Sequence, residues 1–256
     1  MIKHLFTATA ESFLLLRRDK IFLPAVIAGV LIVVLANMAS DWSIEDFDKI
    51  LFDIGTFGFH LTGSIVALFW GTKAVVDSRK DGTLEVDLAA PVSRTIWLMG
   101  KFLGLCFSLG FLAIILMIIW QGVMILNQFG WMTWQHIIVF FYLWINWIIV
   151  GAVATFFATF CSNAVALFSG LCFWLIGLSS ASARQMLSPE TPEPTQYIVK
   201  SIARFWDLQQ FNLSNYIIGS EFPSVYELSW RLFYGVLLVL LLSSMSCVIF
   251  HKRDLT

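Results

Sequence analysis

Few residues in this 256-residue sequence have the types and spacings that catalysis requires. ATP hydrolysis on a P-loop needs Gly-x-x-x-x-Gly-Lys followed by Ser or Thr, because the backbone amides and the hydroxyl hold the phosphates and magnesium. The single Gly-Lys pair is Gly100-Lys101, and Phe102 follows it. The chain therefore lacks a nucleotide-binding motif of its own, and we predict that it is not an enzyme.

Metal and redox chemistry are also poorly supported. The four cysteines occur singly, without the Cys-x-x-Cys spacing typical of metal and disulfide-exchange sites, at Cys106, Cys161, Cys172 and Cys247. The apolar stretches contain no paired carboxylates, Ser/Lys pair or histidine cluster, which disfavours an intramembrane enzyme. We expect no metal and no cofactor bound by this chain.

His60 is an ionisable residue inside a long apolar run. Such a group is costly in hydrocarbon and often functional, so His60 is a candidate intramembrane polar site. A neutral imidazole that hydrogen-bonds to a neighbouring helix would satisfy the same constraint. The sequence leaves both interpretations open.

The most informative charged stretch is the segment 77–94, which interrupts two apolar runs. Leu84 and Leu88, at i and i+4, form one apolar edge and predict a short helix over 83–90. Pro91 ends that helix, and Ser93 can cap the next one. The alternative is an ordinary solvated loop, since charge runs usually face water.

The elements that hold these residues are predicted from composition. Hydrophobic residues make up 59% and charged residues 13% of the chain, against roughly 45–50% and about 25% in soluble proteins. Together with a net charge of −1, this disfavours a soluble domain, a disordered chain and a nucleic-acid binder. Apolar runs near the length of about 20 residues that crosses a bilayer number six, at 21–39, 54–76, 102–126, 137–160, 164–183 and 232–250. We predict one all-α transmembrane domain over 1–256.

The Lys/Arg distribution predicts the orientation. An even number of spans places both termini on one side, and that side carries eleven of the sixteen cations. By the positive-inside rule, both termini are cytoplasmic, in a bacterial inner membrane. Lys73 lies near the cytoplasmic end of the second span, and we expect it to extend toward that boundary.

Two segments outside the spans are amphipathic. The N-terminal stretch has apolar residues at helical spacing and predicts an interfacial helix, at Ile2, Leu5, Phe6, Phe13 and Leu16. The external segment 184–231 begins with three prolines and predicts an amphipathic helix within 197–215, with Ile198, Ile202, Phe205, Trp206 and Leu208 near one face. We expect Trp206 and nearby aromatic residues to lie at the outer membrane surface. The segment could be a lid that completes the fold, a gate, or a docking face.

An ordered string in the loop after the second span resembles the ABC-2 type permease family. Its members here are Asp77, Arg79, Lys80, Gly82, Thr83, Leu84, Glu85, Pro91, Ser93 and Arg94, followed by Gly100-Lys101. Asp81 and Leu88 lie in the same loop and complete the residues expected to contact the partner subunit. The run Phe-Trp-Asp-Leu-Gln-Gln-Phe-Asn-Leu at 205–213 is similar to that of the branch with copper-maturation and gliding-type permeases. The family implies a half-transporter whose loop acts as a coupling helix against a separate ATPase subunit that binds ATP and Mg.

The expected function is therefore that of the permease subunit of an ABC transporter, working as an exporter. Its expected partners are two ATPase subunits, a second copy of itself or a related permease, membrane lipid and a periplasmic protein, but no nucleic acid. The alternative is a complex that transports nothing and transmits force to that periplasmic partner, for example in metalloenzyme maturation. The glycines of the spans fit dimer contacts and internal packing equally well.

Overall fold

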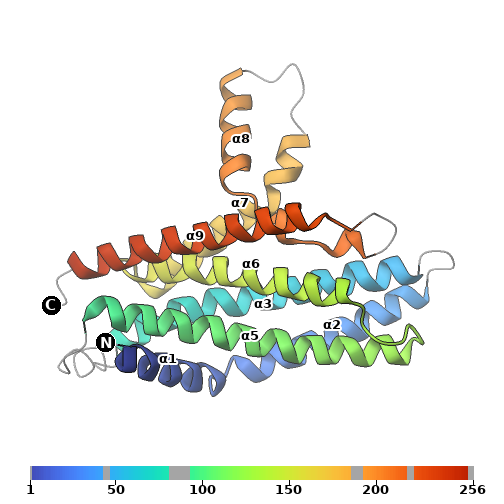
Figure 1. Cartoon of the computed structure of the whole chain (residues 1–256), viewed down its shortest axis with the longest axis horizontal. Helices are drawn as coiled ribbons and strands as arrows, with labels where there is room; N and C mark the ends of the chain where they lie inside the picture. Colours follow the sequence, from blue (N-terminus) through green and yellow to red (C-terminus); the bar gives the residue numbers. More distant parts are fainter. Residues whose placement is uncertain (1, 43–46, 81–92, 186–192, 218–221, 253–256) are drawn as a thin grey trace.

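The regular elements of the described chain are all helices, as predicted (Figure 1). The computed structural model describes residues 2–42, 47–80, 93–185, 193–217 and 222–252. The α-helices are α1 (Ile2–Arg17), α2 (Phe22–Asp41), α3 (Phe47–Lys80), α5 (Arg94–Leu126), α6 (Trp134–Ala158), α7 (Asn163–Gln185), α8 (Glu193–Phe205) and α9 (Val225–Lys252). Two 3-10 turns lie between α8 and α9, η1 (Gln209–Phe211) and η2 (Ser214–Tyr216).

Six of these helices, α2, α3, α5, α6, α7 and α9, are long and apolar enough to cross a membrane, which confirms the six predicted spans. Several are longer than the apolar runs suggested, since α3 has 34 residues and α5 has 33. A span needs only about 20 residues. The helix α5 extends eight residues before the apolar run that begins at 102, through polar residues to Arg94. Ser93 caps it as predicted, accepting a hydrogen bond from the backbone N–H of Ile96 at 3.3 Å.

The bundle centres on α3 and α6, which pack closely because small residues line their contact. A Cβ atom on Gly71 would come within 2.7 Å of the carbonyl oxygen of Gly151, and one on Gly63 would overlap the indole ring of Trp147. Gly55 likewise faces Trp120 of α5. These glycines face residues of their own chain, so internal packing accounts for them.

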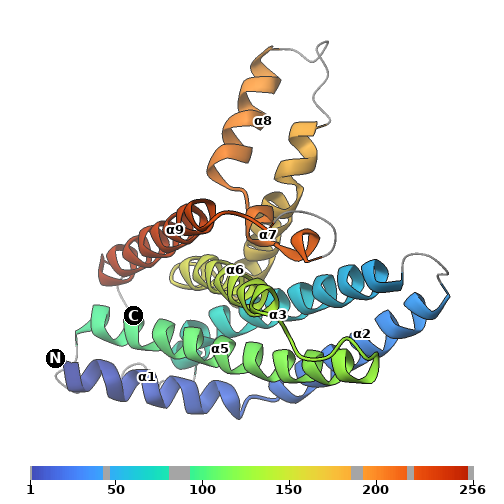
Figure 2. The same ribbon diagram turned by 45° about the vertical axis from the view of Figure 1, so that its right-hand side comes forward.

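The predicted N-terminal helix is confirmed as α1, and one of its faces packs along α5 (Figures 1 and 2). The contact joins small residues, with Ala8 against Gly100 and Ser12 against Gly104. The hydroxyl of Ser12 also donates to the carbonyl oxygen of Lys101 at 3.3 Å. Because the two contacts follow the same order along both helices, α1 and α5 run in the same direction.

The α7–α8 pair projects away from the long helices. The link between α6 and α7 is short, residues 159–162, and α7 begins at Asn163. Figures 1 and 2 both show the later part of α7 and α8 rising side by side from the bundle. We call this feature the α7–α8 arm. Tyr197 and Ile198 of α8 are 76% and 57% exposed.

The predicted external helix is correct only in its first part. The helix α8 ends at Phe205, so the extension to 215 is wrong, and the chain continues through η1 and η2. Trp206, expected at the membrane surface, is only 7% exposed, and its indole N–H donates to the carbonyl oxygen of Phe173 at 2.7 Å. The backbone N–H of Leu208 also donates to a carbonyl oxygen of α7, that of Gly177, at 3.3 Å, and η1 and η2 make short-range hydrogen bonds of their own.

Candidate functional site

Residues 77–94, for which the family resemblance predicts a coupling role, are described only at their two ends, and we call them the coupling segment. Asp77, Arg79 and Lys80 belong to the last turns of α3, and Arg94 begins α5. The guanidinium of Arg94 donates to the carbonyl oxygen of His251 in α9 at 3.3 Å. The predicted helix over 83–90 lies outside the described residues, as do Asp81, Gly82, Thr83, Leu84, Glu85, Leu88 and Pro91.

A small apolar core lies next to the described ends of the coupling segment. We call it the end cluster, and it joins five helices through Val75, Val76, Trp97, Leu98, Ala158, Ala166 and Phe250. The rings of Trp97 and Phe250 are stacked, with centroids 5.6 Å apart. The end cluster therefore packs α3 and α5 against α6, α7 and α9.

Two ion pairs tie the N-terminal region to the helices that flank the coupling segment. Lys73 of α3 binds Asp19 at 2.7 Å, in the corner between α1 and α2. Lys101 of α5 lies 3.5 Å from Glu11 of α1, with a side chain only 6% exposed. The sequence interpretation expected Lys73 to extend toward the membrane boundary and did not identify Asp19 as its partner. The partners lie far apart in sequence, so spacing carries no signal for either pair.

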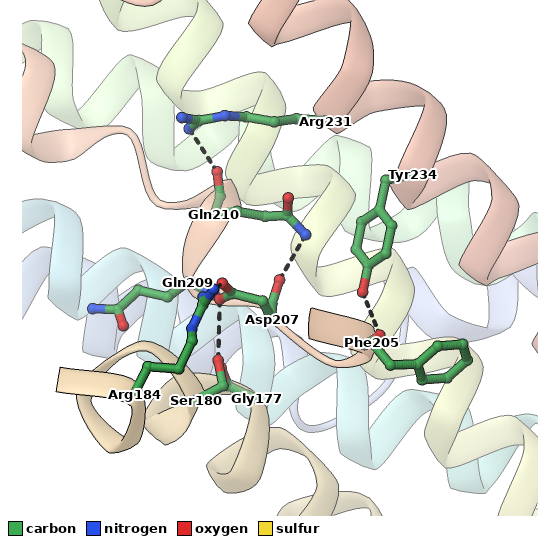
Figure 3. A network of polar contacts seen from close by, with 9 residues as sticks. All are labelled: Gly177, Ser180, Arg184, Phe205, Asp207, Gln209, Gln210, Arg231 and Tyr234. Carbon is green, nitrogen blue, oxygen red and sulfur yellow. Dashed lines mark hydrogen bonds and ion pairs between the residues drawn. The ribbon is translucent and has the colours of Figure 1, made fainter. Parts of the chain in front are cut away.

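On the other side of the bundle, Asp207 is the centre of a polar network (Figure 3). Its carboxylate accepts hydrogen bonds from the hydroxyl of Ser180 and the backbone N–H of Gln209, both at 3.1 Å, and pairs with Arg184. The amide of Gln210 donates to the carbonyl oxygen of Asp207 at 2.8 Å. We call these contacts the Asp207 network. They hold the base of the arm against the chain that returns from it.

The same stretch is fixed to α6 and α9. The guanidinium of Arg231 donates to the carbonyl oxygen of Gln210 at 2.8 Å. The hydroxyl of Tyr234 donates to the carbonyl oxygen of Phe205 at 2.5 Å. Asn146 of α6 donates to the carbonyl oxygen of Leu208 at 3.0 Å. Residues 205–211 are therefore bound to three helices. The resemblance at 205–213 drew attention to this stretch, but nothing in the sequence identified Arg184, Ser180 or Asn146 as its partners.

His60 lies beneath residues 205–211, in the interior of the bundle. It is 2% exposed, and its ring stacks on Trp174 with centroids 6.1 Å apart. The side chain of Asn146 adjoins it, yet Nε2 of His60 has no hydrogen-bond partner among the described residues. A metal ion has no evident site in the described ranges, where no three His, Cys, Asp or Glu residues cluster.

Six apolar helices, with polar and apolar junctions at their ends, define a multi-pass α-helical membrane protein. The chain belongs to the ABC-2 family transporter proteins, because the model of that family matches residues 11–255. No curated protein matches the sequence significantly. Members are membrane subunits without a nucleotide-binding domain of their own, so the family implies an ABC ATPase partner.

Proposed function

We propose that this chain is a permease that couples ATP hydrolysis by separate subunits to export of a substrate across the bacterial inner membrane. Two ATPase subunits, which bind the ATP and Mg, would attach to the cytoplasmic side of a dimer formed with a second copy or a related permease. The observation that carries the proposal is the continuity of the coupling segment with α3 and α5, since both helices enter the end cluster.

The residues of the coupling segment have distinct proposed roles. Leu84 and Leu88 fill a groove on the ATPase subunit, and the charged residues orient that contact, at Asp77, Arg79, Lys80, Asp81, Glu85 and Arg94. Gly82, Thr83 and Pro91 delimit the short helix. When the ATPase subunits close, this helix moves, and α3 and α5 carry the motion into the bundle. The Lys101–Glu11 and Lys73–Asp19 pairs make α1 follow.

A second candidate function is force transmission to a periplasmic protein without transport. It is supported by the α7–α8 arm, whose exposed apolar side chains Tyr197 and Ile198 are available to a partner. We expect Tyr197→Glu with Ile198→Glu to release such a partner while leaving ATPase binding intact. Reconstituted complexes that move substrate without any periplasmic protein would exclude this candidate.

The coupling proposal is tested by co-purification. Leu84→Asp together with Leu88→Asp should abolish recovery of the ATPase subunit with the permease, because two carboxylates cannot enter an apolar groove. The matched control is Thr95→Asp, which adds a carboxylate at an exposed site in the first turn of α5, where negative charge is tolerated. Unchanged co-purification of the double variant would contradict the proposal.

A further inference from the structure

A large groove lies on the side of the bundle, where α1 and α6 flank α5. Its volume is about 720 Å³, within the roughly 300–1,000 Å³ of sites that hold small molecules. Aromatic side chains line much of it, including Phe6 and Phe13 of α1, Phe107 and Phe111 of α5, and Phe141 and Trp144 of α6. Phe6 and Phe107 are 76% and 60% exposed, so the groove opens sideways.

The polar side-chain groups of the lining are already bonded within the chain. The hydroxyl of Thr9 donates to the carbonyl oxygen of Leu5 at 2.8 Å. The indole N–H of Trp144 donates to the carbonyl oxygen of Cys106 at 3.1 Å. Neither group needs a hydrogen bond from an occupant, so the groove suits a purely apolar chain.

A basic cluster adjoins the groove, formed by Arg17, Arg18 and Lys20 at the corner between α1 and α2. Arg17 follows Phe13 by four residues and therefore shares the face of α1 that lines the groove. The ring of Phe111 contacts both Phe13, before the corner, and Phe22, after it, at centroid distances of 6.1 and 5.8 Å. The corner therefore lies directly beside the groove.

Within the part of the chain that the structure describes, no acidic side chain pairs with the cations of this corner. Asp19, the acidic residue within it, is engaged by Lys73 at 2.7 Å and by the backbone N–H of Ile21 at 2.8 Å. Arg17, Arg18 and Lys20 are exposed, and none forms an ion pair with a residue that the structure describes. A ligand that fills the groove therefore meets positive charge at this corner, which lies beside Phe111.

We propose that the groove binds one anionic phospholipid, with an acyl chain between α1, α5 and α6 and the phosphate on the basic cluster. An apolar groove suits the acyl chain of an anionic lipid, and basic residues beside it suit the phosphate. An apolar helix from a second copy could fill the groove. It would leave the basic cluster without a negative charge to pair with. The site does not involve the coupling segment, so it stands apart from the proposed function.

The test is native mass spectrometry of the full chain, titrated with phosphatidylglycerol or phosphatidylcholine of identical acyl chains. We expect one phosphatidylglycerol bound at least tenfold more tightly than phosphatidylcholine, since each basic group near an anionic surface strengthens binding roughly fivefold. Arg17→Gln, Arg18→Gln and Lys20→Gln together should remove this preference. Lys49→Gln with Lys252→Gln, at exposed sites on other helices, should leave it unchanged.

Filling the groove tests the acyl-chain part. Ala10 lines the groove and is exposed, so Ala10→Trp should abolish tight binding of both lipids, whereas Ala164→Trp, at an exposed site on α7, should not. Ile114→Trp, at a position 52% exposed, provides a second filled groove if the first variant does not fold. Equal binding of the two lipids by the wild type overturns the proposal, as does full binding by a folded, filled variant. A filled variant that changes its oligomeric state but binds lipid as the wild type does also overturns the proposal, because the groove would then hold a second copy of the chain.

Discussion

Two regions of the helix bundle are held together by different physical interactions. Beside the coupling segment, the helices meet in the end cluster, where Trp97, Phe250 and their neighbours make apolar contacts. On the opposite side, residues 205–211 are held by the Asp207 network and by side chains of α6 and α9. At the end cluster, the helices meet through apolar side chains. Residues 206–208 leave the helix, so their backbone groups need other partners.

This difference assigns a mechanical role to each region. Apolar contacts do not depend on a particular donor and acceptor. The residues of the end cluster can therefore move together while they stay in contact. Hydrogen bonds depend steeply on distance and angle, so the Asp207 network keeps one geometry until its bonds break. We therefore expect the end cluster to transmit movement and residues 205–211 to act as a latch.

The largest expected effect is at the end cluster. Phe250→Ala should lower the free energy of unfolding by about 3 kcal/mol, because it leaves a cavity beside Trp97. The measurement is unfolding by a denaturing detergent in mixed micelles. Val248→Ala, on the same helix at a position 55% exposed, is the control and should cost far less. Equal losses in the two variants would show that the cluster adds no stability.

The next effect is at the latch. Asp207→Asn should cost about 2 kcal/mol, because it removes the charge that faces Arg184 and weakens the bonds from Ser180 and Gln209. Amide hydrogen exchange at Leu208 and Gln209 should accelerate, while exchange in α3 stays slow. Asp48→Asn, at an exposed site at the start of α3, should change neither measurement. Exchange that accelerates equally in α3 would mean that no local latch exists.

A pair of variants distinguishes charge from packing at the α1–α5 contact. Glu11→Gln should cost about 2 kcal/mol, because it leaves the buried ammonium of Lys101 without its carboxylate. Lys101→Met should cost less than about 1 kcal/mol, since Glu11 is half exposed and its charge returns to water. Unfolding of both proteins under the same conditions measures the difference, and the reverse order would contradict this description of the pair.

The smallest expected effect is the loss of one bond of the latch. Tyr234→Phe removes the hydroxyl that donates to the carbonyl oxygen of Phe205 and should cost about 0.6 kcal/mol, a typical value for such bonds in membranes. Tyr226→Phe, at a position 80% exposed, should cost nothing measurable. A loss above 2 kcal/mol in Tyr234→Phe would mean that the latch breaks as one unit.

Local sequence signals predicted the elements well and their partners poorly. The apolar runs gave the six spans, and Ser93 was recognised as the cap of α5. The helix within 197–215 was predicted ten residues too long, because its apolar periodicity continues past Phe205 while Trp206 and Leu208 bond to α7. The roles of the coupling residues and of His60 stay predictions.

The sequence by itself determined that this chain crosses the membrane six times and lacks a nucleotide-binding motif, because both follow from composition and local order. Only the tertiary structure decided that Lys73 meets Asp19, that Glu11 meets Lys101 and that Asp207 joins the arm to the bundle. These contacts join residues far apart in the chain, and a helix of given periodicity can turn its polar face to any neighbour. Which neighbour it meets is set by the packing of all the helices together.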